Sequence, residues 1–211
     1  IGLNISSGVA NCNILVRGNT ISNLSSTGTG NTMGVFSYSA MSNVTFTKNK
    51  INNIKNTNTA GYGSAGIILA NTINASATTV TNNFIWDVAS YGFNGYASGD
   101  NGNGIVIDGG GGYNIDYNKV VLKANQVLTG AHRASCLLVT SYVTPVGTVN
   151  LRNNIFANLQ TVGNANSRLC VSNLASAGAA VFSDIDYNNY YSASGNLSST
   201  GTNASITGTL A

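Results

Sequence analysis

Residues 44–54 read VTFTKNKINNI and contain the pattern that decides the fold. Asn49 stands at its centre, with Phe46 three positions before it and Ile51 two positions after it. The same arrangement recurs around six asparagines at spacings of 30, 34, 35, 36 and 34 residues: Asn19, Asn49, Asn83, Asn118, Asn154 and Asn188. Repetition at such a period is typical of a solenoid, in which each repeat adds one unit to a stack.

Four columns of residues accompany these six anchors. Apolar residues stand three before the anchor, at Val16, Phe46, Val80, Ile115, Leu151 and Ile185, and two after it, at Ile21, Ile51, Ile85, Val120, Phe156 and Tyr190. Five after it stand Leu24, Ile54, Val88, Lys123, Leu159 and Ala193, where Lys123 breaks the rule. Two before it every residue is polar: Arg17, Thr47, Thr81, Asp116, Arg152 and Asp186. Because alternate side chains of a strand point to opposite faces, the three apolar columns are predicted to share one core.

A second apolar run completes each repeat. These runs are GVFS at 34–37, GIIL at 66–69, GIVID at 104–108, SCLLV at 135–139 and RLCVS at 168–172. One strand before the anchor, one after it and this run make a coil of three short strands. We expect the anchor at the bend between the first two strands, because Asn tolerates the left-handed conformation and its amide can bond to the Asn one coil away. The prediction is an all-β parallel β-helix of about six coils.

The organisation of the chain follows from the columns. Residues 1–193 are predicted to form the β-helix, and residues 194–211 a tail rich in Ser, Thr, Gly and Asn. The first residues resemble the last strand of an earlier coil, so we expect more chain or a capping partner there, because an open coil would expose its core and strand edge. Inserted loops at 25–33, 55–65, 89–103, 124–134 and 160–168 should stack along one edge of the helix.

The amino-acid composition narrows the range of possible functions. Only 7% of the residues are charged, against about 25% in typical proteins, and the few basic residues form no cluster along the sequence, which argues against a nucleic-acid partner. No apolar run approaches the roughly 18 residues needed to span a bilayer. Cys12, Cys136 and Cys170 lack metal-ligand spacing, so buried free thiols are predicted.

The N-x-I-x-N pattern followed by a Gly-led apolar run resembles the right-handed parallel β-helix repeats of the pectate-lyase-like superfamily. The segment FSDIDYNNYYSASGNLSS at 182–199 also resembles segments of secreted, multidomain surface proteins of Bacteroidota. Those proteins usually carry a C-terminal sorting domain for type IX secretion. The resemblance therefore implies a secreted or cell-surface location, with further coils or other domains in the same polypeptide.

Three of the loops hold the candidate site residues. The catalytic candidates are Asp100, Asp108, His132, Arg133 and Arg168, which resemble the parts of a β-elimination enzyme: a base, and cations that neutralise a substrate carboxylate. The binding candidates are Tyr91, Phe93 and Tyr96, which either stack on sugar rings or pack their own loop against the solenoid. Two aspartates do not make a calcium site of six to eight oxygens, so no metal site and no cofactor are predicted, with calcium as the one alternative.

The sequence is compatible with three functions. The first is a non-catalytic stalk or adhesive segment of a large secreted or cell-surface protein, with a glycan or a cell surface as partner. The second is a carbohydrate-active β-helix enzyme, similar to a polysaccharide lyase, or an inactive sugar-binding relative. The third is a phage or virion fibre. The absence of a clear catalytic motif favours the first and makes an enzyme the less favoured reading.

Overall fold

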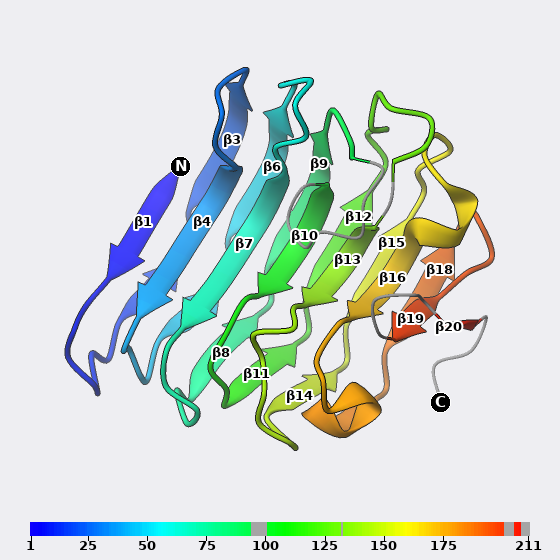
Figure 1. Cartoon of the computed structure of the whole chain (residues 1–211). Helices are drawn as coiled ribbons and strands as arrows, with labels where there is room; N and C mark the ends of the chain where they lie inside the picture. The colour runs from blue at the N-terminus through cyan, green and yellow to red at the C-terminus, as the bar shows by residue number, and fades with distance from the viewer. Residues whose placement is uncertain (94–100, 132, 201–204, 208–211) are drawn as a thin grey trace.

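The computed structural model describes residues 1–93, 101–131, 133–200 and 205–207 of the chain and confirms a right-handed parallel β-helix. Three parallel sheets run the length of the molecule (Figure 1). Two short 3-10 helices, η1 (Ala165–Ser167) and η2 (Gly178–Val181), are the only helical turns among the described residues. The strand triplets β2–β4 to β17–β19 make six coils, as the sequence predicted.

Each sheet collects one strand from every coil. Sheet A holds the Gly-led strands, in the order β1 (Leu3–Ser6), β4 (Thr32–Ser39), β7 (Ser64–Asn71), β10 (Gly102–Ile107), β13 (Ala134–Val139), β16 (Arg168–Asn173), β19 (Ser198–Thr200) and the antiparallel β20 (Ser205–Thr207). Sheet B holds the strands before the anchors: β2 (Leu15–Arg17), β5 (Thr45–Thr47), β8 (Thr78–Thr81), β11 (Tyr113–Asp116), β14 (Val149–Arg152) and β17 (Phe182–Asp186). Sheet C holds the strands after them: β3 (Thr20–Ser26), β6 (Lys50–Asn56), β9 (Phe84–Ser90), β12 (Lys119–Leu122), β15 (Ile155–Asn158) and β18 (Asn189–Ser192).

The register of the strands matches the sequence columns. In sheet B, Val16 pairs with Phe46, and the column continues through Val80, Ile115, Leu151 and Ile185. In sheet C the residues two after the anchor pair in the same way, from Ile21 to Tyr190. Both columns face one continuous hydrophobic core, in which Phe46, Ile85 and Phe156 are fully buried.

The predicted core position five residues after the anchor is correct in only half of the coils. Leu24, Ile54 and Val88 join the core, but Lys123 and Ala193 are exposed and Leu159 is half-buried. The last three sheet C strands end at the fourth residue after the anchor, where Leu122, Asn158 and Ser192 turn inward instead. The prediction of a core position five after the anchor is therefore wrong for these coils.

The anchors form a continuous hydrogen-bonded ladder, as predicted. Each anchor Nδ2 donates to the Oδ1 of the anchor one coil further on, at 2.9 to 3.1 Å from Asn19 to Asn188. The same Oδ1 accepts the backbone N–H of the preceding anchor. Since four of the six anchors are buried, this ladder satisfies polar groups that would otherwise destabilise the fold.

The left-handed residue at each bend is not the anchor, contrary to the prediction. It is the residue immediately before the anchor, with φ between 54° and 70°, at Gly18, Lys48, Asn82, Tyr117, Asn153 and Tyr187. At four of these positions the side chain is exposed, in Lys48, Asn82, Tyr117 and Tyr187, which is why large residues such as Lys and Tyr are accommodated there. The anchor itself turns inward, where its amide finds partners in the two neighbouring coils.

The inserted loops connect sheet C to sheet A in every coil, as expected, and they lie along one edge of the molecule (top of Figure 1). Successive loops contact each other: Asn58 Nδ2 donates to the Thr27 carbonyl at 2.8 Å, and the Asn164 N–H donates to the Ala131 carbonyl at 2.8 Å. Beyond residue 193, β19 extends sheet A by pairing in parallel with β16.

Candidate functional site

The two arginines of the loop edge are held by structural contacts. Arg133 is 2% exposed, and its guanidinium donates to the Ser172 hydroxyl at 3.0 Å. Arg168 is half-buried, and its guanidinium donates to the Gln160 carbonyl. Strand pairing places them on adjacent coils, because Ala134 is opposite Arg168. Both cations therefore brace the loops against sheet A.

Asp108 does not join this group. It follows β10 at the end of sheet A opposite the inserted loops, whereas Arg133 and Arg168 lie where β13 and β16 begin. A six-residue strand separates the two ends by about 17–20 Å. Burial raises the pKa of Asp108, and a hydrogen bond from Thr140 opposes the shift. Asp100 and His132 lie outside the described residues, so the structure leaves their roles as predictions.

Two of the three aromatic candidates, Tyr91 and Phe93, lie among the described residues. Tyr91 is half-buried, and its carbonyl accepts the N–H groups of Val127 and Leu128 from the next loop. Phe93 is 38% exposed and packs against Gly61, where an added Cβ would lie 2.8 Å from the Phe93 ring. Tyr96 lies outside the described residues. The Tyr91 backbone and the Phe93 ring thus each contact a neighbouring loop, and part of the Phe93 ring is open to solvent.

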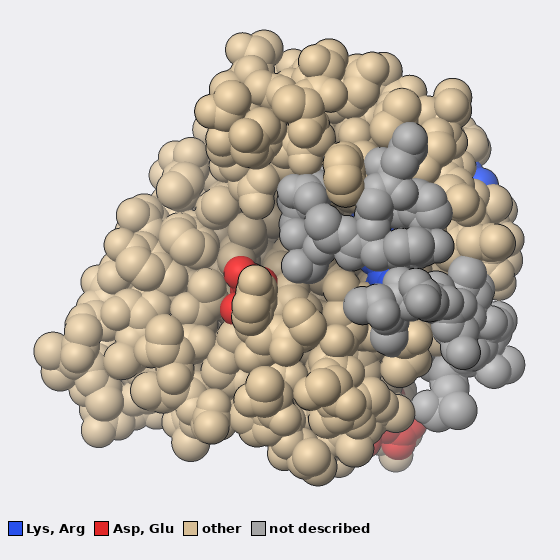
Figure 2. Space-filling model, viewed as in Figure 1, with Lys and Arg blue, Asp and Glu red and all other residues tan. Residues whose placement is uncertain are grey.

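Metal-ligating side chains do not gather in the described part of the chain, where no group of three His, Cys, Asp or Glu occurs. Cys136 and Cys170 are buried free thiols, and burial raises the pKa of the Cys136 thiol. Cys12 is also free but only half-buried. On the face shown in Figure 2 the described surface is almost uncharged. The described residues contain no helix long and apolar enough to cross a membrane.

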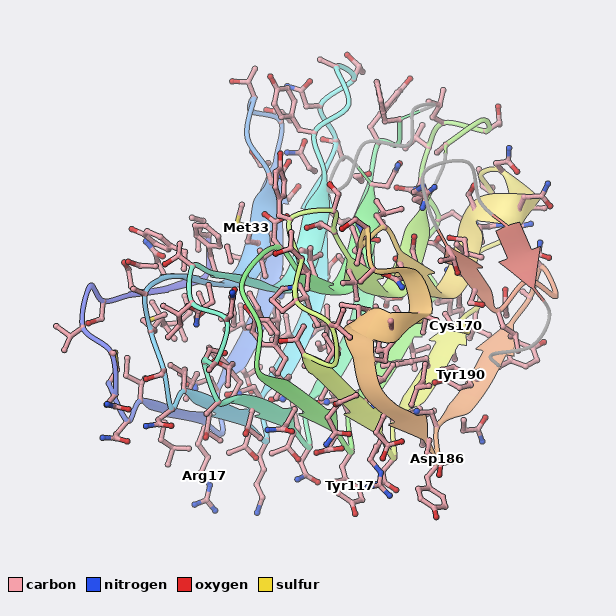
Figure 3. The ribbon with its side chains drawn as sticks, turned by 60° about the horizontal axis from the view of Figure 1, so that its bottom comes forward. Arg17, Met33, Tyr117, Cys170, Asp186 and Tyr190 are labelled. Atoms are coloured by element: carbon pink, nitrogen blue, oxygen red, sulfur yellow. The ribbon has the colours of Figure 1, made fainter. Side chains whose placement is uncertain are left out.

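Charged side chains do meet on the outer face of sheet B. Asp116, Arg152 and Asp186 stand in register, as the sequence columns predicted. The Arg152 guanidinium forms its ion pair with Asp184, at 3.3 Å, because an irregularity after Val149 brings Asp184 opposite Asn150. Arg152 also lies over the Tyr187 ring, 5.2 Å from its centroid. Figure 3 shows Tyr117 and Asp186 at this margin, pointing away from the ribbon, whereas Cys170 lies within it. This cluster aligns the last coils.

The outer face of sheet C carries a set of residues that reasoning from the loops missed. Phe84 and Trp86 of β9 point outward with their rings stacked, 4.3 Å between centroids and 27° between planes. In the register of the sheet, Phe84 stands between Lys50 of β6 and Lys119 of β12. The Lys119 ammonium lies 5.2 Å from the Phe84 centroid, close enough for a cation–π attraction. We call Lys50, Lys55, Phe84, Trp86 and Lys119 the lysine–aromatic face.

A shallow hollow of about 360 Å³ adjoins this face where β6 and β9 end. Lys55 lines it together with amide, hydroxyl and methyl groups: Asn56, Thr57, Ala89, Ser90, Ala124, Asn125 and Val127. The sequence contained a signal for this face, since the outward positions one and three after each anchor can be read from the columns. The sequence-based prediction did not include this face because it placed the candidate residues in the inserted loops.

No protein-family model, no curated protein and no solved structure matches the chain. The fold and the geometry nevertheless define its class, which is a three-sheet parallel β-solenoid with an asparagine ladder. Its exposed features are a loop edge braced by arginines, a charged cluster on sheet B and the lysine–aromatic face on sheet C.

Proposed function

We propose that this chain is a non-catalytic β-helix segment of a larger secreted or cell-surface protein, and that it serves as a stiff stalk with an adhesive, glycan-binding surface. One observation carries the proposal. Asp108 lies at the opposite end of sheet A from Arg133 and Arg168, and both guanidinium groups donate to structural partners. A general base and a charge-neutralising cation must both reach one reacting group, and these three residues do not converge.

The architecture supports the mechanical half of the proposal. Every coil hydrogen-bonds to the next through three parallel sheets, and the anchor ladder adds side-chain bonds along the same axis. With a rise of about 4.8 Å per coil, a stack of such coils extends without a flexible joint. The proposal also includes membership of the pectate-lyase-like superfamily and an origin among Bacteroidota surface proteins that use type IX secretion. Both rest on the sequence resemblance.

The alternative is a carbohydrate-active enzyme of the same superfamily, or its inactive sugar-binding relative. The inserted loops favour it, because they stack on one edge in every coil and place Arg168 beside that edge. Per-repeat insertions on one face are often the binding face of a solenoid.

Incubation of the purified chain with acidic and neutral polysaccharides separates the two functions. We expect no new reducing ends and no unsaturated uronate absorbance from acid to alkaline pH, with calcium or with a chelator. Cleavage that disappears in Arg168→Gln or His132→Ala, while Arg17→Gln keeps it, would replace the adhesive function with the enzymatic one.

A further inference from the structure

The positive charge of this protein is distributed unevenly. All five of its lysines lie on sheet C or directly beside it: Lys48, Lys50, Lys55, Lys119 and Lys123. One acidic residue, Asp87, shares the sheet, and its carboxylate already accepts the backbone N–H of Ala124 at 3.2 Å. Asp116, Asp184 and Asp186 belong to sheet B instead. Sheet C therefore presents a positive face in a protein whose net charge is only +3.

The lysines on this face keep their charge available. Across the described ranges the one ion pair is Arg152–Asp184, so no described carboxylate neutralises a lysine. Lys50 and Lys119 are exposed on either side of Phe84. Because the coil rise is about 4.8 Å, these two ammonium groups emerge from strands about 10 Å apart along the solenoid axis.

The aromatic pair between them supplies a different kind of contact. Phe84 and Trp86 are half-buried and stacked on each other, so a sugar ring can pack on their exposed surface at little cost in side-chain entropy. Beside them in register stand Asn52 and Val121. Asn52 offers both a donor and an acceptor, which suits a hydroxyl group.

These features fit a linear polymer of sugar rings that carries carboxylate or sulfate groups. The axial repeat of the coils is close to the length of one sugar unit in an extended chain, so successive units can meet Lys50, Phe84 and Lys119 in turn. The hollow beside Lys55 lies five residues further along β6, roughly 16 Å from this row, so it is not part of the proposed site. Single-stranded nucleic acid fits less well, because it requires a series of aromatic platforms for successive bases, and this face offers one stacked pair.

We infer that the lysine–aromatic face binds an acidic polysaccharide along the solenoid axis at its row of Lys50, Phe84 and Lys119, with a sugar ring on Phe84 and Trp86 and acidic groups on Lys50 and Lys119. This inference rests on the proposed adhesive function and names its surface and its ligand. It moves the binding surface from the loop edge to the outer face of sheet C.

The chain carries its own reporter for the test, because Trp86 is its only tryptophan. Titration with polygalacturonate, alginate or dextran sulfate should change the intrinsic tryptophan emission saturably, and uncharged dextran should not. The affinity should fall as salt is added, because exposed charges are screened. Lys50→Gln and Lys119→Gln should each weaken binding about five-fold, which corresponds to roughly 1 kcal/mol.

Matched controls distinguish the face from charge and aromaticity in general. Arg17→Gln removes one exposed positive charge at the end of sheet B (Figure 3) and should leave the affinity unchanged. In affinity electrophoresis, Trp86→Ala should lose at least ten-fold in affinity, whereas Tyr142→Ala, which removes a 69% exposed ring elsewhere, should lose none. Thermal melting checks that each variant folds, and the exposed lysine variants keep the test valid if Trp86→Ala unfolds.

Several outcomes would overturn the inference. One is a wild-type chain that binds no acidic polysaccharide, and another is binding that the Lys50, Lys119 and Trp86 variants leave intact. Equal competition by oligodeoxythymidylate would reassign the face to nucleic acid. None of these results produces cleavage, so the stalk function would survive them. Cleavage of the polymer would end the proposed function even if the face still bound.

Discussion

The first three coils and the last three solve the same packing problem differently. In sheet C, β3, β6 and β9 have seven residues each, whereas β12, β15 and β18 have four. In sheet A, Gly34, Gly66 and Gly104 precede the paired core residues of the early coils, and Cys136 and Cys170 hold that position in the later ones. In sheet B, the column of Arg17, Thr47 and Thr81 is followed in the later coils by the alternating charges of Asp116, Arg152 and Asp186.

The longer strands depend on one left-handed residue. Asn23, Asn53 and Asp87, four positions after their anchors, have φ of 59°, 52° and 54°. This kink resets the alternation, so that the residues two and five after the anchor both point inward. In the later coils the fourth residue keeps an extended backbone, points inward and ends the strand. The lesson is that a single backbone conformation decides how much of sheet C each coil contributes.

The glycines of the early coils have a steric cause. A Cβ on Gly66 would lie 2.5 Å from Cγ2 of Ile85 and 2.6 Å from the Gly104 carbonyl oxygen. The branched residues of sheet C thus press directly against the backbone of sheet A. In the later coils the same column accommodates buried thiols, of which Cys170 donates to the Phe156 carbonyl at 3.4 Å.

The largest expected effect is core truncation in either half. Ile85→Ala and Phe156→Ala should each lower the free energy of unfolding by about 2–5 kcal/mol, because both side chains are fully buried and leave a cavity. Denaturant unfolding measures the loss. Leu15→Ala, which truncates a 59% exposed side chain, should cost under about 0.5 kcal/mol, and equal losses for all three would contradict the core assignment.

The anchor ladder is the feature that the two halves share. Asn83→Ala and Asn154→Ala should therefore cost alike, about 1–3 kcal/mol each, because each leaves a buried backbone N–H of the preceding anchor without its acceptor. Asn19→Ala should cost less, since Asn19 is exposed in the first coil. Thermal melting of the three variants ranks their losses of stability. A small loss for Asn154→Ala beside a large loss for Asn83→Ala would show that the ladder does not stabilise all coils equally.

At the fourth position after the anchor, glycine should give the more stable variant in the first three coils and alanine the more stable variant in the last three. At Asn53, where φ is 52°, Ala should be less stable than Gly by about 1–2 kcal/mol, because a Cβ is strained there. At Asn158, which is buried in an extended strand, Gly should be less stable than Ala by about 0.5–1 kcal/mol. Each Ala–Gly pair removes the same amide, so chemical unfolding isolates the backbone effect. The same order at both sites would refute the kink.

The smallest effect concerns the charged column of the later coils. Arg152→Met should cost about 0.2–1 kcal/mol at neutral pH, as exposed ion pairs do, while Thr81→Ala in the same column should cost less. Burial raises the pKa of Asp116, and the nearby Arg152 counteracts that shift. The attraction requires ionised carboxylates, so the cost of Arg152→Met should grow as pH rises through the carboxyl range and vanish in acid. A loss independent of pH would mean that Arg152 acts through packing on Tyr187.

Much of this fold could be predicted from the residues alone. The spacing of Asn19 to Asn188 established the coil count, and the apolar columns three before and two after each anchor established the register of sheets B and C. These predictions succeed because in-register parallel strands stack equivalent residues and bury one face. The candidate site was harder to predict. The sequence suggested that Arg133 is an exposed loop cation, and only its contact with Ser172 in the structure reveals a structural role.

What the sequence by itself determined is the parallel β-helix, its asparagine ladder and the edge that carries its loops, because each follows from a side-chain pattern repeated every coil. The tertiary structure alone decided which residue at a bend is left-handed, where the sheet C strands end, and that Phe84, Trp86 and the lysines share one open face. Asn occupies the fourth position after the anchor at Asn23, Asn53 and Asn158, yet the first two are left-handed and the third turns inward. Asn tolerates both conformations, so the neighbouring coils, through their packing and hydrogen bonds, select between them.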